Sequence, residues 1–230
     1  MDSMEELFRI IDCVKPGETV LVEYYPSYIP EFVTLSLVMY GRKRGLPVII
    51  DDNFDALHVI HKHLKLWGIE EDFRDVFVIK SDGSVDIGNV IAKIRFSAEP
   101  VVYVRRYEEA GKNVLPQLGE SINIVLGLEK IFAFVSSVRE FYLLITRIQR
   151  FLGGPRKAFY LVNKETAKSM EFNPLPEMER IASTVVEIIP TPISGRIVFK
   201  KTPIVSLTGT KLEIPMEVMS SAASHKGNRV

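Results

Sequence analysis

Short apolar runs alternate with helix-patterned segments along this chain, and this alternation restricts the fold more than any other feature. The first run, Thr19–Glu23, is followed by a turn and then, from Pro30, by apolar residues at helical spacing. The second run, Pro47–Ile50, ends in Asp51-Asp52 and also precedes a helix-patterned segment. Parallel strands need long crossover connections, which are usually helices. The alternation therefore predicts an α/β fold with a mostly parallel, doubly wound sheet.

The same patterning continues to the end of the chain. Further strands are predicted at Val76–Lys80, Val101–Val104, Ile122–Leu126, Ala158–Val162 and Val185–Ile188, and helices at Val138–Leu152 and Pro176–Ser183. Short strands at Arg196–Lys200 and Ile204–Leu207 are expected to close the sheet on an antiparallel edge. We expect one domain over residues 1–215. The remainder, 216–230, is expected to be a flexible tail because most of it has almost nothing to bury.

Composition excludes several classes of protein. Lys and Arg number 29, and so do Asp and Glu, so no broad basic field exists and no tight nucleic-acid binding is expected. The single cysteine, Cys13, cannot form an intrachain disulfide, and we expect it to be a small buried residue rather than a reactive thiol. The first residues are acidic, unlike a signal peptide, and no apolar run approaches the ~20 residues of a membrane span. The sequence thus predicts a cytoplasmic protein without a membrane contact.

Several segments together resemble a known family. C-V-K-P-G-E-T-V-L-V is followed by a helix ending in G-R-K-R-G, then by L-P-V-I-I-D-D, and then by a helix ending in L-K-L-W-G. Farther on, I-N-I-V-L-G-L-E-K-I-F lies where a Walker B strand would be. This order resembles the RecA-like ATPases of the KaiC type over roughly residues 12–201, as a pattern rather than a motif. The chain also looks like a small uncharacterised family from hyperthermophilic archaea.

The resemblance implies a P-loop NTPase fold whose Walker motifs are degenerate. A Walker A loop needs glycines for the close approach of backbone to phosphate, a lysine for the phosphates and a hydroxyl for magnesium. Here Tyr24, Ser27 and Ile29 stand at the glycine positions, with Pro30 and Glu31 at the lysine and hydroxyl positions. Pro30 lacks the N–H that would face an anion, and Glu31 adds negative charge.

The carboxylates of the family's chemistry are also altered. The Walker B aspartate position corresponds to Gly127, and Glu129 lies two residues farther on. Asp51 and Asp52 correspond to the paired acids of which one activates water in active relatives. Two interpretations remain open for this pair: either one acid still acts on a metal, or Asp52 caps the next helix while Asp51 is solvated.

Two charged clusters have simple structural interpretations. His58, His61 and His63 lie on one predicted helix, but at most His58 and His61 share a face, so no metal site is predicted. The run Arg42–Arg44 ends a helix, where positive charge favours the helix dipole.

These observations predict a non-catalytic binding or regulatory module without a cofactor. Its expected partner is a protein or peptide, including a second copy of the chain, because Tyr24, Tyr25 and Tyr28 place aromatic surface at the expected ligand crevice. That crevice comprises Tyr24, Tyr25, Ser27, Tyr28, Glu31, Asp51, Asp52 and Glu129. Two alternatives remain: the tyrosines only plug the pocket, or the chain is an unconventional nucleotide-binding protein or ATPase without a standard Walker A loop.

Overall fold

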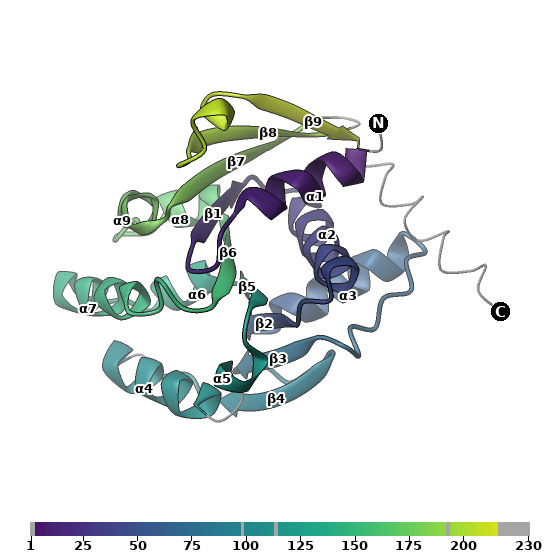
Figure 1. Cartoon of the computed structure of the whole chain (residues 1–230). Helices are drawn as coiled ribbons and strands as arrows, with labels where there is room; N and C mark the ends of the chain where they lie inside the picture. The colour runs from purple at the N-terminus through teal and green to yellow at the C-terminus, as the bar shows by residue number, and fades with distance from the viewer. Residues whose placement is uncertain (1–2, 98, 113–114, 192–193, 216–230) are drawn as a thin grey trace.

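One nine-stranded sheet organises the described part of the chain, in the order β4-β3-β2-β5-β6-β1-β7-β8-β9 (Figure 1). The computed structural model describes residues 3–97, 99–112, 115–191 and 194–215. The strands are β1 Thr19–Tyr24, β2 Val48–Asn53, β3 Phe77–Ser81, β4 Asn89–Ile94, β5 Ser121–Leu126, β6 Arg156–Asn163, β7 Thr184–Pro190, β8 Ser194–Lys201 and β9 Lys211–Pro215. The first seven strands in this order, from β4 across to β7, pair in parallel. The pairs β7-β8 and β8-β9 are antiparallel. The predicted mixed α/β fold with a largely parallel sheet is confirmed.

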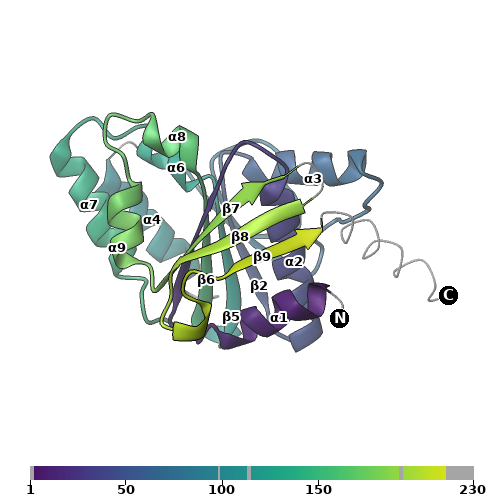
Figure 2. The same cartoon turned by 90° about the horizontal axis from the view of Figure 1, so that it is seen from above.

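Helices cover both faces of the sheet (Figure 2). One face packs against α1 Ser3–Cys13, α2 Ile29–Arg44 and α3 Ala56–Leu66. The other face packs against α4 Pro100–Gly111, α6 Leu128–Phe132, α7 Val138–Gln149, α8 Lys164–Lys168 and α9 Leu175–Ile181, with the short α5 Leu115–Leu118 nearby. Strands β2 and β5 are buried along their whole length, as expected for central strands of a parallel sheet that helices cover on both faces.

The parallel strands bring distant residues to one edge of the sheet. Tyr24, Asn53, Leu126 and Asn163 each stand at the carboxyl end of a strand, in β1, β2, β5 and β6. In open α/β sheets, ligands bind outside this edge. No helix among the described residues is both long and apolar enough to cross a bilayer.

Several local predictions need correction. The run Val101–Val104 is not a strand but part of α4, because Pro100 starts a helix whose Tyr103 and Val104 pack against the sheet. Ile204–Leu207 does not form a strand either: Val205–Leu207 is a 3-10 turn, and the antiparallel edge strand is β9. Cys13 is exposed rather than buried. The tail from 216 to 230 lies outside the described residues.

The basic run Arg42–Arg44 lies in the last turn of α2, as predicted, and its arginines form ion pairs that the sequence did not predict. Arg42 pairs with Glu71 and Arg44 pairs with Asp12, each at 2.6 Å. These ion pairs connect the end of α2 to the segment after α3 and to α1.

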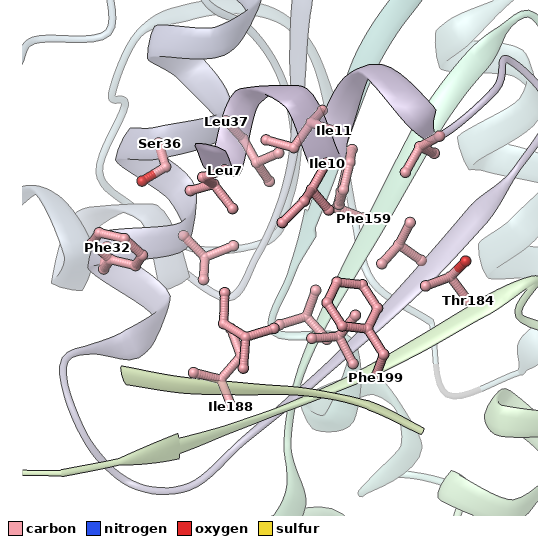
Figure 3. Close-up of a pocket in the computed structure, with 16 residues that line it drawn as sticks. Leu7, Ile10, Ile11, Phe32, Ser36, Leu37, Phe159, Thr184, Ile188 and Phe199 are labelled. Carbon is pink, nitrogen blue, oxygen red and sulfur yellow. The ribbon is translucent and has the colours of Figure 1, made fainter. Parts of the chain in front are cut away.

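An apolar cavity of about 70 Å³ lies between α1 and the sheet (Figure 3). Ser36 and Thr184 are the polar residues among those that line it; Leu7, Ile10, Phe159 and Phe199 are among the others. Apolar cavities of this kind stay dry. It lies on the face covered by α1 and α2, apart from the polar groups described next.

Candidate binding site

The turn between β1 and α2 is anchored by its own side chains. The Tyr25 hydroxyl donates to Glu187 Oε1 at 2.8 Å, and the Lys164 ammonium lies 5.6 Å from the centre of the Tyr25 ring. Ser27 Oγ donates to the carbonyl oxygen of Tyr25 at 2.8 Å and accepts from the N–H of Ile29. Tyr25 and Ser27 thus hold the turn against the body of the protein, and no glycine contributes to its shape.

Tyr28 is the exposed aromatic residue of this turn. Its side chain is 46% exposed, and its ring centre lies 4.6 Å from that of Trp67 and 5.4 Å from that of His63, in edge-to-face arrangements. Edge-to-face contacts stabilise aromatic pairs beyond simple burial. Tyr28, His63 and Trp67 therefore form an aromatic cluster between the turn and α3, with one face of Tyr28 turned to solvent.

Glu31 is buried in the first turn of α2, next to this cluster. Its Oε1 lies 2.6 Å from His63 Nδ1, whereas Oε2 is buried without a hydrogen-bond partner among the described residues. Unpaired buried carboxylate oxygens are costly in free energy. The first turn of α2 thus presents a carboxylate where phosphate-binding folds present N–H groups.

Glu129 supplies a second buried carboxyl group near the carboxyl edge. It is only 6% exposed, its Oε2 has no partner in the described part of the chain, and burial raises its pKa to about 7. Burial, followed by the charges of Glu129 and Glu31, also raises the pKa of Tyr24. Tyr24 therefore lies within electrostatic reach of both carboxyl groups.

Gly127, which precedes Glu129, is required by the backbone. Its φ is +69°, and a Cβ atom at this position would lie 2.7 Å from the carbonyl oxygen of Asn53. An aspartate side chain does not fit at this position without a backbone shift.

The two acids at the end of β2 diverge, because consecutive strand residues point to opposite faces. Asp52 Oδ1 accepts from the N–H of Leu57 at 2.9 Å, and Oδ2 accepts from Lys80 at 3.0 Å. Asp52 thus accepts from an N–H in the first turn of α3, as its predicted capping role requires, although the residue at the N-cap position of this helix is Asp55. Asp51 is not solvated as expected: it is 5% exposed and accepts from Tyr107 and Asn123, each at 2.9 Å, on the face away from α2. The structure does not bring Asp51 to the turn.

Sequence reasoning missed an ionic network beside Tyr25. Glu23 is fully buried, and burial raises its pKa. Its Oε2 lies 3.3 Å from Lys164 and 3.0 Å from Lys200, and Lys164 also pairs with Glu187 at 2.6 Å. The sequence signals this network only by placing a glutamate inside the apolar run of β1. It does not identify the partners of Glu23, because they are more than 140 residues away.

The histidines do not form a metal site in the described structure. His63 contacts Glu31, and Nδ1 of both His58 and His61 is buried without a partner among the described residues. No group of three or more His, Cys, Asp or Glu side chains in these residues has a geometry that would hold a metal ion.

Comparison with solved structures shows that the fold is similar to that of a KaiC-like protein. The KaiC-like protein PH0186 from the hyperthermophilic archaeon Pyrococcus horikoshii OT3 gives a TM-score of 0.59 at 12% identity, over 89% of this chain and 88% of that chain. An uncharacterized protein from Pyrococcus horikoshii, PH0321, in complex with an unknown peptide, gives a TM-score of 0.63 at 16% identity, over 94% of each chain. These likenesses show the fold.

The family follows from a second comparison. A family model described as "Pyrococcus protein of unknown function, DUF257" matches residues 9–213, and the chain therefore belongs to this family. A protein from Pyrococcus horikoshii OT3, PH0250, gives a TM-score of 0.77 at 28% identity, over 92% of this chain and 98% of that chain. No curated protein matches the chain. The predicted likeness to an uncharacterised archaeal family is confirmed.

Proposed function

We propose that the chain is a non-catalytic, KaiC-like binding or regulatory module that recognises a protein or peptide through the turn between β1 and α2. The observation that carries this proposal is the exposed ring of Tyr28, which packs edge-to-face against Trp67 and His63. Rigid aromatic side chains are enriched at binding hot spots because they bury a large area at a small entropic cost. The peptide in the complex of PH0321 agrees with a binding role for this fold.

The first turn of α2 argues against a phosphate ligand at this place. We infer that the P-loop is degenerate, because Pro30 offers no N–H and Glu31 brings a buried carboxylate to the helix start. A nucleotide phosphate would meet repulsion there rather than the usual attraction. The negative charge at the start of α2 therefore favours a binding module over the alternative of an unconventional nucleotide site.

The three tyrosines of the turn differ in exposure and in hydrogen bonding. Tyr24 is largely buried, the hydroxyl of Tyr25 donates a hydrogen bond to Glu187, and Tyr28 alone among the three is exposed. We therefore propose that Tyr28 contacts the partner directly, whereas Tyr25 holds the turn in place. A second copy of the chain is one partner that such a surface would accept.

The experiment begins by selecting peptides from a random displayed library on the wild-type chain. Enriched peptides are then titrated by calorimetry into wild type, Tyr28→Ala and a matched control, Tyr142→Ala. Tyr142 is 51% exposed on α7, close to the 46% of Tyr28, so the two substitutions remove similar exposed rings. Binding that depends on Tyr28 and not on Tyr142 supports the proposal. Binding that is equal in both variants, or no enrichment at all, contradicts it.

A further inference from the structure

A second polar centre lies on the opposite face of the sheet, under α4 and α7. Asp51 on β2 and Tyr160 on β6 each pair in register with Val125 on the intervening strand β5, and Arg156 stands at the amino end of β6. Tyr107 of α4 covers them. Asp51, Tyr107, Arg156 and Tyr160, together with Asn53 and Tyr103, are polar residues in the wall of a cavity of about 50 Å³. The cavity is thus lined by several polar groups whose burial costs free energy unless they form hydrogen bonds or ion pairs.

Asp51 has its partners, whereas Arg156 faces hydroxyl groups. Tyr107 and Asn123 donate to the two oxygens of Asp51. Arg156 forms no ion pair with a carboxylate among the described residues; it shares the cavity wall with Tyr107 and Tyr160, and both of these and Asp51 act electrostatically on its guanidinium. Burial raises the pKa of Asp51, and the charge of Arg156 acts against that rise. Arg156 therefore retains donor capacity toward the cavity.

Arg156 also connects this cavity to the outside. Arg156 and Phe151 line both the inner cavity and a groove of about 460 Å³ at the amino edge of β5 and β6. The groove has mainly apolar walls, formed by Ile49, Leu115, Phe151, Leu152 and Pro155 among others. Its other arginine, Arg150, is paired with Glu108 at 3.2 Å.

The position of Arg156 is fixed from several sides. Its backbone N–H donates to the carbonyl oxygen of Gly154 at 2.7 Å, and its backbone carbonyl oxygen accepts from the N–H of Gly17 at 2.8 Å. The guanidinium lies 5.5 Å from the centre of the Phe151 ring, a cation–π contact. The backbone bonds fix the main chain at Arg156 and the Phe151 ring limits the motion of the guanidinium, which reduces the entropy that a bound ligand would cost.

These features select one ligand chemistry. A planar guanidinium matches the two oxygens of a carboxylate, and the apolar walls suit an apolar body. A phosphate, with up to two negative charges, would be less favourable beside Asp51 in so small a cavity. We propose that Arg156 binds the carboxylate of a small organic acid, whose apolar body lies in the groove between α5 and the segment joining α7 to β6. The site is separate from the turn that carries Tyr28.

The test uses benzoate and its neutral analogue benzamide as probes of the full chain. NMR spectra of the protein with isotope-labelled tyrosine rings report binding at Tyr107 and Tyr160. Benzoate is expected to shift these resonances and to bind about tenfold or more tightly than benzamide. Arg156→Lys, which keeps the charge and so balances Asp51, should weaken benzoate about tenfold or more, while Arg150→Lys should leave its affinity within about twofold.

A purely structural Arg156 gives a different result. If Arg156 only neutralises Asp51, benzoate shifts neither tyrosine, or it binds Arg156→Lys and wild type equally; either outcome overturns the proposal. Equal binding of benzamide does so as well. Should Arg156→Lys fail to fold, the comparison of benzoate with benzamide on the wild-type chain remains the test, and a failure of benzoate to shift the Tyr107 and Tyr160 resonances overturns the proposal. Tyr28→Ala is expected to leave benzoate binding unchanged.

Discussion

Replacement of the buried Glu129 by Gln should change how the stability of the protein depends on pH. The folded-state pKa of Glu129 is about 7, against an ordinary value of 4.5, because burial disfavours the carboxylate. The folded state therefore binds this proton more tightly than the unfolded state does. The favourable contribution is complete below the ordinary pKa, and it is lost as the pH rises from there toward the folded-state pKa.

The size of the effect follows from this difference in pKa. Each unit of difference between the folded-state and ordinary pKa corresponds to about 1.36 kcal/mol, so the loss in the free energy of unfolding is about 3 kcal/mol in total. About 2–3 kcal/mol of this loss falls between about pH 5 and about pH 8. Urea unfolding of wild type and Glu129→Gln over this range measures it. Relative to wild type, Glu129→Gln is expected to gain that amount of stability as the pH rises.

The control for this prediction is Glu165→Gln, at an exposed position on α8. Its stability should follow that of wild type at every pH. Parallel curves for wild type and Glu129→Gln would refute the reasoning, since they would mean that Glu129 keeps the same proton affinity in both states.

Three further predictions concern catalysis, nucleic acid and a buried ion pair. Phosphate release from magnesium-bound ATP or GTP should not exceed that of a heat-inactivated control; steady release that disappears in Asp52→Asn would support the nucleotide alternative instead. Gel-shift assays at physiological salt should show no tight binding of single- or double-stranded DNA, and a submicromolar shift that weakens steeply with salt would reveal a basic groove. Lys80→Met should lower the free energy of unfolding by about 3–5 kcal/mol, because it leaves Asp52 buried without its cation and removes a partner of Asp55. Chemical denaturation measures that loss, and a change below about 1 kcal/mol would contradict it.

The elements that sequence reasoning predicted well are those with strong local signals. Strand β1 and helix α2 were predictable because a buried apolar run, a proline at the helix start and helical periodicity lie next to one another. Helix α4 was not, because V-V-Y-V has high strand propensity and its helical state depends on packing between the sheet and α7. Tertiary contacts override propensity in such short runs.

The candidate site was predictable in position but not in detail. The carboxyl edge follows from the parallel order of the strands, and this order identified Tyr28 and Glu31 as neighbours of the crevice. The contact of Glu31 with His63 depends on how α2 packs against α3, and the partners of Asp51 come from α4 and β5. Pattern reasoning treats each element separately, so it does not supply contacts between elements that are distant in sequence.

The affinity of a selected peptide for Tyr28→Ala shows whether the exposed ring of Tyr28 is part of a recognition surface. Calorimetry on wild type, Tyr28→Ala and Tyr142→Ala, with thermal melting to show that each is folded, gives the comparison. Tyr28→Ala is expected to lose about 2 kcal/mol of binding free energy, about thirtyfold in affinity, while Tyr142→Ala binds like wild type. An unchanged affinity in folded Tyr28→Ala would contradict the claim and would leave the tyrosines as a plug of the crevice.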